Sequence, residues 1–244
     1  LASISDPWGR QATLGYTPAG ALERIERPNG VVTTVAYDQL GGITRLAHVG
    51  SQSNTIAGYT YQYDSNGLRT RSTEDSGRVV DYAYDSSGRL VLEKSTVASL
   101  SSSLGYTYYA NGDRQTRTMT RSDGTIESTT YTYDANSRLL REEISDTAPG
   151  TSPYSVEYSY DDNGSLLSRI APLDSASFTY DARRRLVEVA RDHGGTRTVV
   201  SYVYDHFGNR VETIRNGVAT RHVVDSNRPL ARTLLDLDES GNVL

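Results

Sequence analysis

The sequence predicts an all-β protein built from successive antiparallel β-hairpins. Three observations predict this fold class: an aromatic-x-Tyr-Asp unit recurs about ten times, most units lead into a turn signal, and no segment has the amphipathic pattern of a helix. The units follow one another at intervals of 20 to 27 residues, counted from Tyr16 to Val224. We therefore expect residues 1–244 to form one repeat region of about ten hairpin units, with insertions tolerated in one part of each unit.

The first element of each unit is a strand that carries two tyrosines. Residues at i and i+2 of a strand share a face, so both rings of a Tyr-x-Tyr sequence should point the same way. The residues between them, such as Gln62, Ala83 and Thr132, are small or polar, as an exposed face requires. The residues that define the structural repeat are Tyr37, Asp38, Tyr63, Asp64, Gly67, Tyr84, Asp85, Gly88, Tyr133, Asp134, Tyr160, Asp161, Gly164, Tyr180, Asp181, Tyr204, Asp205 and Gly208.

The aspartate that follows the tyrosines opens a turn. Asp favours the first position of a type I turn and Gly the fourth, and Asp64, Asp85 and Asp161 each stand three residues before a Gly. The carboxylate of such an Asp accepts hydrogen bonds from backbone N–H groups further along the turn. An Arg-Leu pair, such as Arg89-Leu90, then begins the returning strand.

A second, more variable turn ends each hairpin unit. Asn29-Gly30, Asp123-Gly124 and Asn216-Gly217 are hairpin signals of the kind that place residues at positive φ. Where the interval between units is longest, we expect polar inserts in place of a tight turn, at Ser95 to Ser103 and at Ser145 to Ser152.

Composition indicates a thin core that is rich in tyrosine. Hydrophobic residues make up 36% of the chain, which has 18 Tyr against two Phe and one Trp. The net charge is −5 with both signs mixed along the chain, which argues against a nucleic-acid partner. No apolar stretch approaches the length of a membrane span, and the absence of cysteine leaves the compartment open.

No group of residues stands apart from the repeat as a catalytic, metal or cofactor site. Asp161-Asp162-Asn163-Gly164 has the composition of a calcium loop but lacks the spaced acidic ligands of an EF-hand, so we interpret it as a turn. The four histidines show no ligand spacing, and we expect them to lie exposed in loops: His48, His193, His206 and His222.

The tyrosines and arginines admit two interpretations. The rings could stack on equivalent rings of neighbouring repeats and so form an aromatic ladder, or they could line a face that binds sugars. Arginines recur after the turns and suggest Asp–Arg contacts between repeats; they are Arg10, Arg69, Arg89, Arg114, Arg138, Arg185 and Arg210.

These tyrosine-aspartate units resemble the YD or RHS repeat of bacterial RHS proteins, Tc-toxin shell components, wall-associated proteins and teneurins. The resemblance covers nearly the whole chain. It implies a long, curved sheet of hairpins that spirals into a hollow shell, which in toxin members encloses a cleaved C-terminal toxic domain and in teneurins serves extracellular adhesion. The self-cleavage region and the effector of toxin members have no counterpart here. The chain begins and ends in mid-pattern, so we expect it to be a segment of a longer protein.

The resemblance favours a structural role without catalysis or cofactor. We expect a shell segment that encloses or displays another segment of the same polypeptide, in a secreted or cell-surface bacterial protein. One alternative is an extracellular adhesin or carbohydrate-binding surface, with cell-surface glycans or other proteins as partners. The other is a polysaccharide-degrading enzyme.

Overall fold

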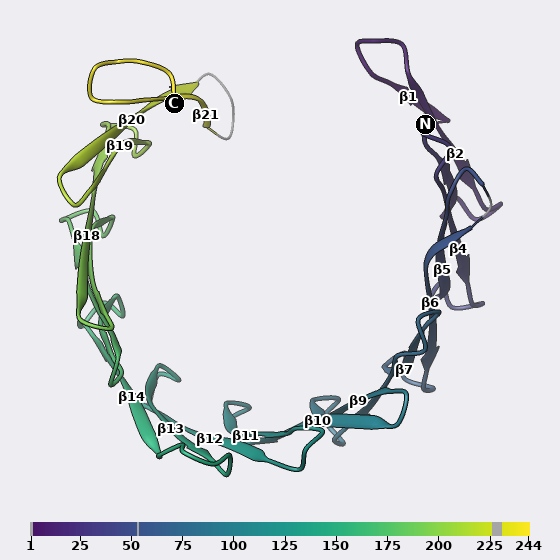
Figure 1. Ribbon diagram of the computed structural model, residues 1–244, viewed down its shortest axis with the longest axis horizontal. Helices are drawn as coiled ribbons and strands as arrows, with labels where there is room; N and C mark the ends of the chain where they lie inside the picture. Colours follow the sequence, from purple (N-terminus) through teal and green to yellow (C-terminus); the bar gives the residue numbers. More distant parts are fainter. Residues whose placement is uncertain (1, 53, 226–230) are drawn as a thin grey trace. The chain divides into compact units, whose positions relative to one another are not determined.

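The computed structural model describes residues 2–52, 54–225 and 231–244. Within these residues the chain forms 21 β-strands and no helix, which confirms the predicted all-β class (Figure 1). Nothing in this part of the chain has the helical length and apolar character needed to cross a lipid bilayer.

The contacts between residues divide the chain into two compact units. The first comprises Leu1–Ser128 and Thr147–Pro149, and the second comprises Thr129–Asp146 and Gly150–Leu244, so that the boundary falls within strand β12 (Ile126–Tyr133). The other strands of the first unit are β1 (Ser3–Ser5), β2 (Gln11–Tyr16), β3 (Leu22–Glu26), β4 (Val32–Tyr37), β5 (Ile43–Val49), β6 (Thr55–Tyr63), β7 (Arg69–Glu74), β8 (Val79–Tyr84), β9 (Leu90–Val97), β10 (Leu100–Tyr108) and β11 (Arg114–Thr120). Those of the second unit are β13 (Leu139–Asp146), β14 (Tyr154–Tyr160), β15 (Leu166–Ile170), β16 (Asp174–Tyr180), β17 (Leu186–His193), β18 (Thr196–Tyr204), β19 (Arg210–Arg215), β20 (Val218–Asp225) and β21 (Arg232–Leu237).

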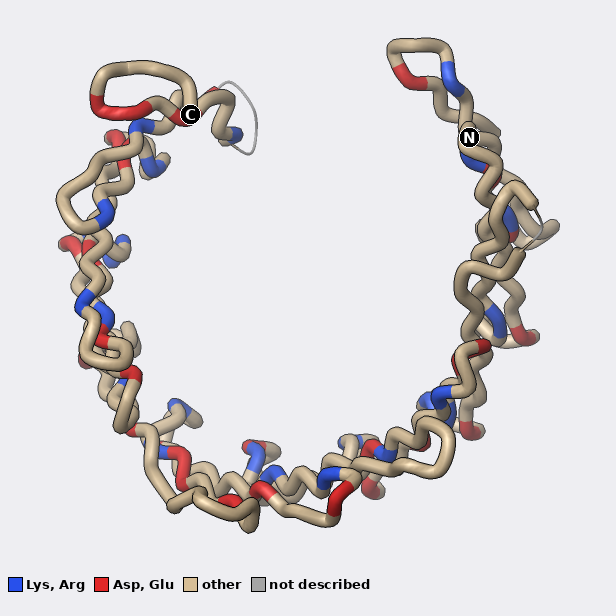
Figure 2. Tube along the Cα trace, in the orientation of Figure 1, with Lys and Arg blue, Asp and Glu red and all other residues tan. Residues whose placement is uncertain are grey.

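Successive strands pair with each other in chain order. In the first unit every strand from β1 to β10 pairs antiparallel with the strand that follows it. In the second unit the same holds from β13 to β21. Each repeat therefore supplies one hairpin, whose first strand ends in the tyrosines and whose second strand begins after the turn. Figure 2 shows acidic and basic residues interspersed along the trace.

The turn that opens at each repeat aspartate, here called the Tyr-Asp turn, is held by the aspartate itself. In the turn of Asp85, the Asp85 N–H donates to the Arg89 carbonyl at 2.9 Å, and the Gly88 N–H donates to the Asp85 carbonyl at 3.0 Å. The carboxylate oxygen Oδ1 accepts from the N–H groups of Ser87 and Arg89, both at 2.9 Å. The same four bonds recur in the turns of Asp6, Asp38, Asp64, Asp134, Asp161 and Asp181.

The third residue of the Tyr-Asp turn projects into solvent. Its side chain makes none of the four bonds that define the turn. In three turns it is a large apolar group, because Trp8, Leu40 and Phe207 are 79%, 86% and 73% exposed. The identity of this residue is therefore not constrained by the turn.

The fourth residue of the turn adopts the left-handed conformation. Gly67 and Gly88 have φ of 79° and 75° there. Two of the turns that the structure describes lack glycine at this position, and there Ser137 and Arg184 take the same conformation with φ of 60° and 61°. An L-residue is strained by roughly 1–2 kcal/mol in this region, so these two turns form against a local cost.

A β-bulge follows many of the Tyr-Asp turns, although the strands across the Asp6 turn pair without one. Tyr84 pairs with Leu90 while the preceding Ala83 pairs with Leu92, so Val91 is an extra residue in the returning strand. The same register shift occurs at the second tyrosine of other repeats, among them Tyr37, Tyr63, Tyr160 and Tyr204. A bulge increases the local twist of the strand pair, and here it does so in each repeat that has the bulge.

Each unit is a sheet one layer thick, and its core is correspondingly small. Among the described residues the most buried are Val80, at 2% exposed, and Thr33, Ala47, Thr129, Ile144, Val156 and Ala190. Four of these stand five residues before a turn aspartate, namely Thr33, Val80, Thr129 and Val156. The expectation of a tyrosine-rich core is therefore wrong, since no described tyrosine is fully buried and the core consists of small and β-branched residues.

The long segments between repeats differ from each other. The expectation of a polar insert at Ser95 to Ser103 is wrong, because β9 and β10 continue through it and Val97 pairs with Leu100 across a tight turn. Ala98 makes this turn possible by adopting φ of 53°. Residues 147–153 lie outside the strands, in agreement with the insert expected after Ser145.

The left-handed position yields a stability prediction. Gly67→Ala should lower the free energy of unfolding by about 1 kcal/mol, because nothing lies near the added Cβ and only the conformational cost remains. Ser137→Gly should raise it by up to about 1 kcal/mol, since relief of strain exceeds the entropy cost of glycine. Urea unfolding measures both, with Ala135→Gly in the same turn as the control that should be destabilising. If Ser137→Gly and Ala135→Gly changed the free energy of unfolding in the same direction, this explanation would be wrong.

Candidate functional site

The junction between successive repeats is where side chains of the repeat meet in a constant arrangement. The second tyrosine of a repeat donates its phenolic hydrogen to a backbone carbonyl of the preceding hairpin, five residues after the first residue of that hairpin's turn. Bonds of this kind, 2.6–2.9 Å long, join Tyr37 to Leu22, Tyr63 to Ile43, Tyr84 to Arg69, Tyr108 to Leu90, Tyr160 to Leu139 and Tyr204 to Leu186. Each tyrosine thus ties its own repeat to the one before.

The arginine four residues after the turn aspartate ties its repeat to the one that follows. Arg138 donates from Nε to Asp134 Oδ2 at 2.5 Å and from Nη1 to the Asp161 carbonyl at 3.1 Å. Its guanidinium carbon lies 5.3 Å from the centre of the Tyr160 ring. Arg89 and Arg185 make the same three contacts with their own neighbours.

The prediction that these Asp–Arg ion pairs join neighbouring repeats is wrong. The Asp–Arg pairs of Asp85, Asp134 and Asp181 lie within one hairpin, as does that of Asp6. What reaches the next repeat is the other end of the guanidinium, which contacts a carbonyl and a ring. The arginine is long enough to do both because its Nε and Nη1 point in different directions.

A second class of arginine stands five residues after the first turn residue. The Arg69 guanidinium carbon lies 5.0 Å from the centre of the Tyr61 ring and 5.9 Å from that of Tyr82 in the next repeat. Arg114 and Arg210 lie over Tyr106 and Tyr202 in the same way. The ladder is thus built of tyrosine and arginine, and at this junction a cation lies over the rings that were expected to stack on each other.

These contacts change the acidity of the groups involved. The Arg138 backbone N–H is the largest cause of the lowered pKa of Asp134, and the Arg138 guanidinium lowers it further against the opposing effect of burial. The pKa values of Asp85 and Asp181 are lowered by the equivalent N–H groups of Arg89 and Arg185. Burial raises the pKa of the Tyr160 phenol, as it does that of Tyr84.

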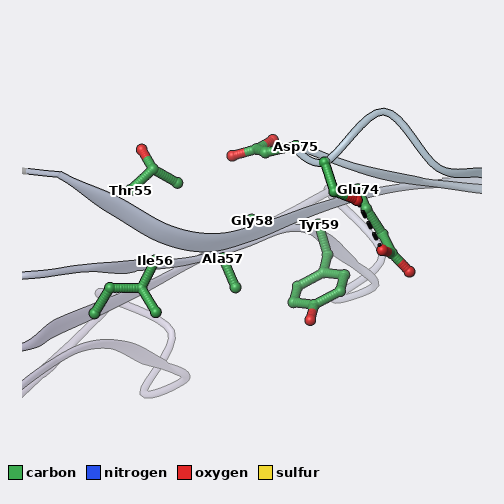
Figure 3. Close-up of a pocket in the computed structure, with 8 residues that line it drawn as sticks. Thr55, Ile56, Ala57, Gly58, Tyr59, Glu74 and Asp75 are labelled. Atoms are coloured by element: carbon green, nitrogen blue, oxygen red, sulfur yellow. Dashed lines mark hydrogen bonds between the residues drawn. The ribbon is translucent and has the colours of Figure 1, made fainter.

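A pocket of about 330 Å³ lies beside strand β6 in the first unit (Figure 3). Ile56, Ala57 and Tyr59 lie on one side of the strand, and the Asp75 carboxylate lies on the other (Figure 3). Arg45 binds this carboxylate through two bonds of 3.0 and 2.8 Å. The pair crosses the strand over Gly58, where a Cβ would lie 2.0 Å from Asp75 Oδ2, so the glycine is required for the contact.

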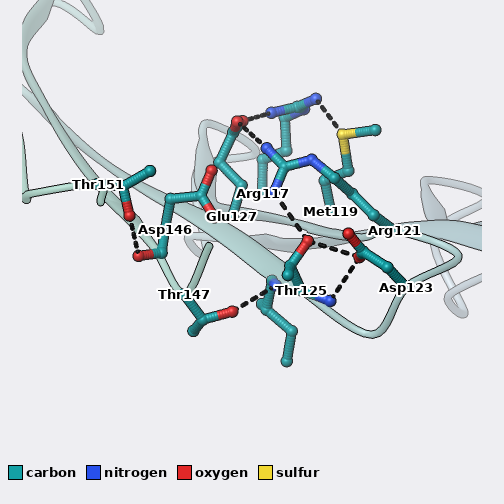
Figure 4. A network of polar contacts seen from close by, with 10 residues as sticks. Arg117, Met119, Arg121, Asp123, Thr125, Glu127, Asp146, Thr147 and Thr151 are labelled. Carbon is teal, nitrogen blue, oxygen red and sulfur yellow. Dashed lines mark hydrogen bonds and ion pairs between the residues drawn. The ribbon is translucent and has the colours of Figure 1, made fainter. Parts of the chain in front are cut away.

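A polar network surrounds the Asp123-Gly124 turn between strands β11 and β12 (Figure 4). Glu127 accepts from Arg117 at 2.8 Å and from Arg121 at 3.0 Å. The Thr125 hydroxyl donates to Asp123 Oδ1 at 2.7 Å, and the Thr125 N–H is the largest cause of the lowered pKa of Asp123. The network fixes the Asp123-Gly124 turn and leaves no ionised group without a partner in it.

Three histidines lie in strands rather than in loops as expected: His48 in β5, His193 in β17 and His222 in β20. His193 is nevertheless exposed at the end of its strand, and His206 lies in an exposed turn, as expected. His48 Nδ1 lies 2.8 Å from the Thr33 hydroxyl, which also accepts from Arg27. Each of His48 and His222 lies on a half-buried face of the sheet and contacts a threonine hydroxyl of the adjacent strand, Thr33 and Thr213 respectively.

His222 lies at the centre of a Thr-His-Asp arrangement in the second unit. Its Nε2 is 2.8 Å from Thr213 Oγ1 and its Nδ1 is 2.7 Å from Asp236 Oδ1, with the His222 side chain 10% exposed. A hydrolase triad also needs backbone N–H groups that stabilise an oxyanion. Thr213 pairs with Tyr202 and Thr220 in the adjacent strands, so its amide belongs to the sheet. The two hydrogen bonds of His222 link strands β19, β20 and β21.

The other site expectations concern metal ions. Asp161 caps its own turn through Asn163 and Ser165, as the turn interpretation requires. Over the residues that the structure describes, no three histidine or carboxylate side chains are grouped as metal ligands.

Comparison with known proteins identifies the repeat. Residues 63–98, which span two Tyr-Asp turns and the hairpin between them, match the RHS Repeat family model. Residues 63–98 carry an RHS repeat. No curated protein matches its sequence.

Two solved structures match the RHS-repeat fold seen here. A crystal structure of a TcdB2–TccC3–TEV complex aligns with a TM-score of 0.64 and 14% identity, over 93% of this chain and 13% of that chain. A structure of the Photorhabdus luminescens Tc holotoxin pore aligns with a TM-score of 0.57 and 13% identity, over 95% and 16%. At these identities the likeness shows the fold alone, and this chain spans less than a fifth of either relative.

The contribution of the tyrosine hydrogen bond between repeats can be measured by removing one atom, the phenolic oxygen of Tyr160. Tyr160→Phe should lower the free energy of unfolding by about 0.5–1.5 kcal/mol, because the bond to the Leu139 carbonyl is lost and the ring under Arg138 remains. Tyr160→Ala should cost more, since the ring is lost as well. Chemical denaturation measures both against Gln62→Ala, an exposed residue that should change stability little. A Phe variant as stable as the native chain would show that the bond contributes nothing.

The lowered pKa values of Asp85, Asp134 and Asp181 predict acid sensitivity. A depressed folded-state pKa contributes stability above the unfolded pKa of about 3.9, and this stability is lost as pH falls through the folded value. The urea midpoint should therefore be level between about pH 7 and 5 and fall below about pH 4. Asp134→Asn should lower the urea midpoint at neutral pH. The difference in midpoint between this variant and the native chain should be smaller at about pH 3 than at neutral pH. An equal difference at both pH values would contradict the assignment.

Proposed function

We propose that the chain is a wall segment of an RHS-repeat shell that encloses or displays another segment of the same polypeptide. The observation that carries this proposal is the single layer. A globular monomer of 26.8 kDa exposes about 10,800 Å² of surface, whereas this chain exposes 15884 Å². A sheet with so much exposed surface suits a wall whose function is to separate two compartments.

The junctions support a wall that holds itself together. Tyrosine bonds reach back to the preceding repeat and arginine contacts reach forward to the next, so each repeat is stabilised by its neighbours, as in other repeat proteins. The RHS repeat at residues 63–98 and the fold shared with the two toxin structures favour the same role. We infer a secreted or cell-surface location and a bacterial toxin-type assembly on this basis.

A sugar-binding surface finds less support. The rings of Tyr61, Tyr106 and Tyr202 each have a guanidinium over one face, and the second tyrosines use their hydroxyls between repeats. The repeat tyrosines thus serve the sheet. A polysaccharide-degrading enzyme finds no support in the arrangement around His222.

The shell role can be tested on the native polypeptide that contains this chain. Under native conditions a protease should leave one segment outside the repeats intact, as identified by mass spectrometry, because the wall excludes the protease. The same polypeptide with Tyr160→Ala should release that segment to digestion sooner, and Gln62→Ala should not. Digestion of every non-repeat segment at the rate seen in denaturant would rule the shell out.

A further inference from the structure

The arginine contacts between repeats define a binding site for a guanidinium group. The site has three parts: the Oδ2 atom of a turn aspartate, the second tyrosine ring of the next repeat, and the backbone carbonyl of the residue after that tyrosine. Arg89, Arg138 and Arg185 occupy it in their junctions, with ring distances of 4.7, 5.3 and 4.8 Å. In each case the chain supplies the cation from the position four residues after the turn aspartate.

The junction after Asp38 has the same three parts without that arginine. The residue four positions after Asp38 is Gly42. Asp38 Oδ1 caps its turn through Leu40 and Gly42, as in the other repeats. Among the described residues no side chain donates to Asp38 Oδ2, which lies 2.7 Å from the place where a Gly42 Cβ would be.

The tyrosine ring and the backbone carbonyl of the site are both present at this junction. Tyr63 makes the standard bond to the Ile43 carbonyl at 2.8 Å. Beside it lies a cleft of about 520 Å³, lined by Asp38, Gly42, Tyr63 and Asp64 together with Thr44 and Gln62. The cleft lies where the arginine of other junctions runs, and its threonine hydroxyl and glutamine amide add acceptors to the wall.

The next junction shows what happens when an apolar residue takes the arginine position. Leu68 follows Asp64 by four residues, and its Cδ1 lies 3.7 Å from the place of a Gly88 Cβ. Arg138 runs past Gly164 in the same manner, with its Cδ 4.0 Å from the place of that Cβ. Leu68 therefore lies along the path of the arginine stem, and a cleft of about 690 Å³ lined by Asp64, Leu68 and Tyr84 remains at that junction as well.

We propose that the cleft between Asp38 and Tyr63 binds an arginine side chain of another polypeptide segment. A carboxylate accepts a guanidinium through charge-assisted, geometrically matched bonds. The tyrosine ring attracts the same group through its face. Lysine suits the site less well, because an ammonium group cannot bond the carboxylate, the ring and the carbonyl at once through a planar fork.

The proposal is tested by titrating the isotope-labelled chain with Nα-acetyl-arginine amide and following amide shifts by NMR. Saturable shifts should appear at Asp38, Gly42 and Tyr63, and the neutral citrulline analogue should produce none. Asp38→Asn should weaken binding at least tenfold. Asp162→Asn, which removes the same charge from an exposed turn residue elsewhere, should leave binding unchanged.

Gly42→Arg is the decisive variant, because it supplies the guanidinium from within the chain. The Asp38 carboxylate must turn aside to admit its Cβ, because Oδ2 lies 2.7 Å from that place in the native chain. The variant should show no shift with the arginine probe. The proposal is overturned if this variant binds the probe as the native chain does, if citrulline gives the same shifts, or if Asp162→Asn weakens binding as much as Asp38→Asn. The measurement concerns one junction of the chain alone, so its outcome does not depend on the shell role.

Discussion

The turn after the second tyrosine, which in most repeats is held by an aspartate carboxylate, determines where the other side chains of the repeat can act. The Oδ1 atom of this carboxylate takes two backbone N–H groups and so closes the turn, which leaves Oδ2 to face the residue four positions on. The turn in turn places a bulge opposite the second tyrosine and brings that tyrosine within reach of the preceding hairpin. A sheet of one layer has no second layer to bury its side chains against, so such polar junctions must set the register that a larger core would otherwise set.

The two links of a junction run in opposite directions along the chain. A tyrosine hydroxyl reaches back, and an arginine reaches forward to a ring and a carbonyl. Both links use backbone carbonyls as acceptors, so they depend on the position of the strand and not on the side chain that the strand carries. This explains how the repeats keep one geometry while the sequences between them differ in length and composition.

Much of the fold could be predicted because the repeat motif is local. Tyr-x-Tyr-Asp-x-x-Gly specifies a strand, a turn and a returning strand within one hairpin, and all three were found. The contacts of Arg89 and Arg138 could not be predicted, since spacing in the sequence does not show which of two hairpins a long side chain reaches. The strand positions of His48 and His222 were missed for a related reason, because their threonine and aspartate partners come from adjacent strands. The cleft at Gly42 is visible in the sequence only as a glycine in the arginine position, and that position has meaning only once the junction geometry is known.

The third residue of the Tyr-Asp turn contributes only its backbone N–H to the turn, so its side chain can vary, as Trp8, Leu40 and Phe207 show. Since the backbone and the aspartate hold the turn, replacing the tip changes the surface chemistry without changing the scaffold. Antibody loops separate variation from framework in the same manner, with diversity confined to the tips of a constant β-structure. A row of such tips, one per hairpin, gives natural variation or protein engineering a set of positions at which specificity can change while foldability is preserved.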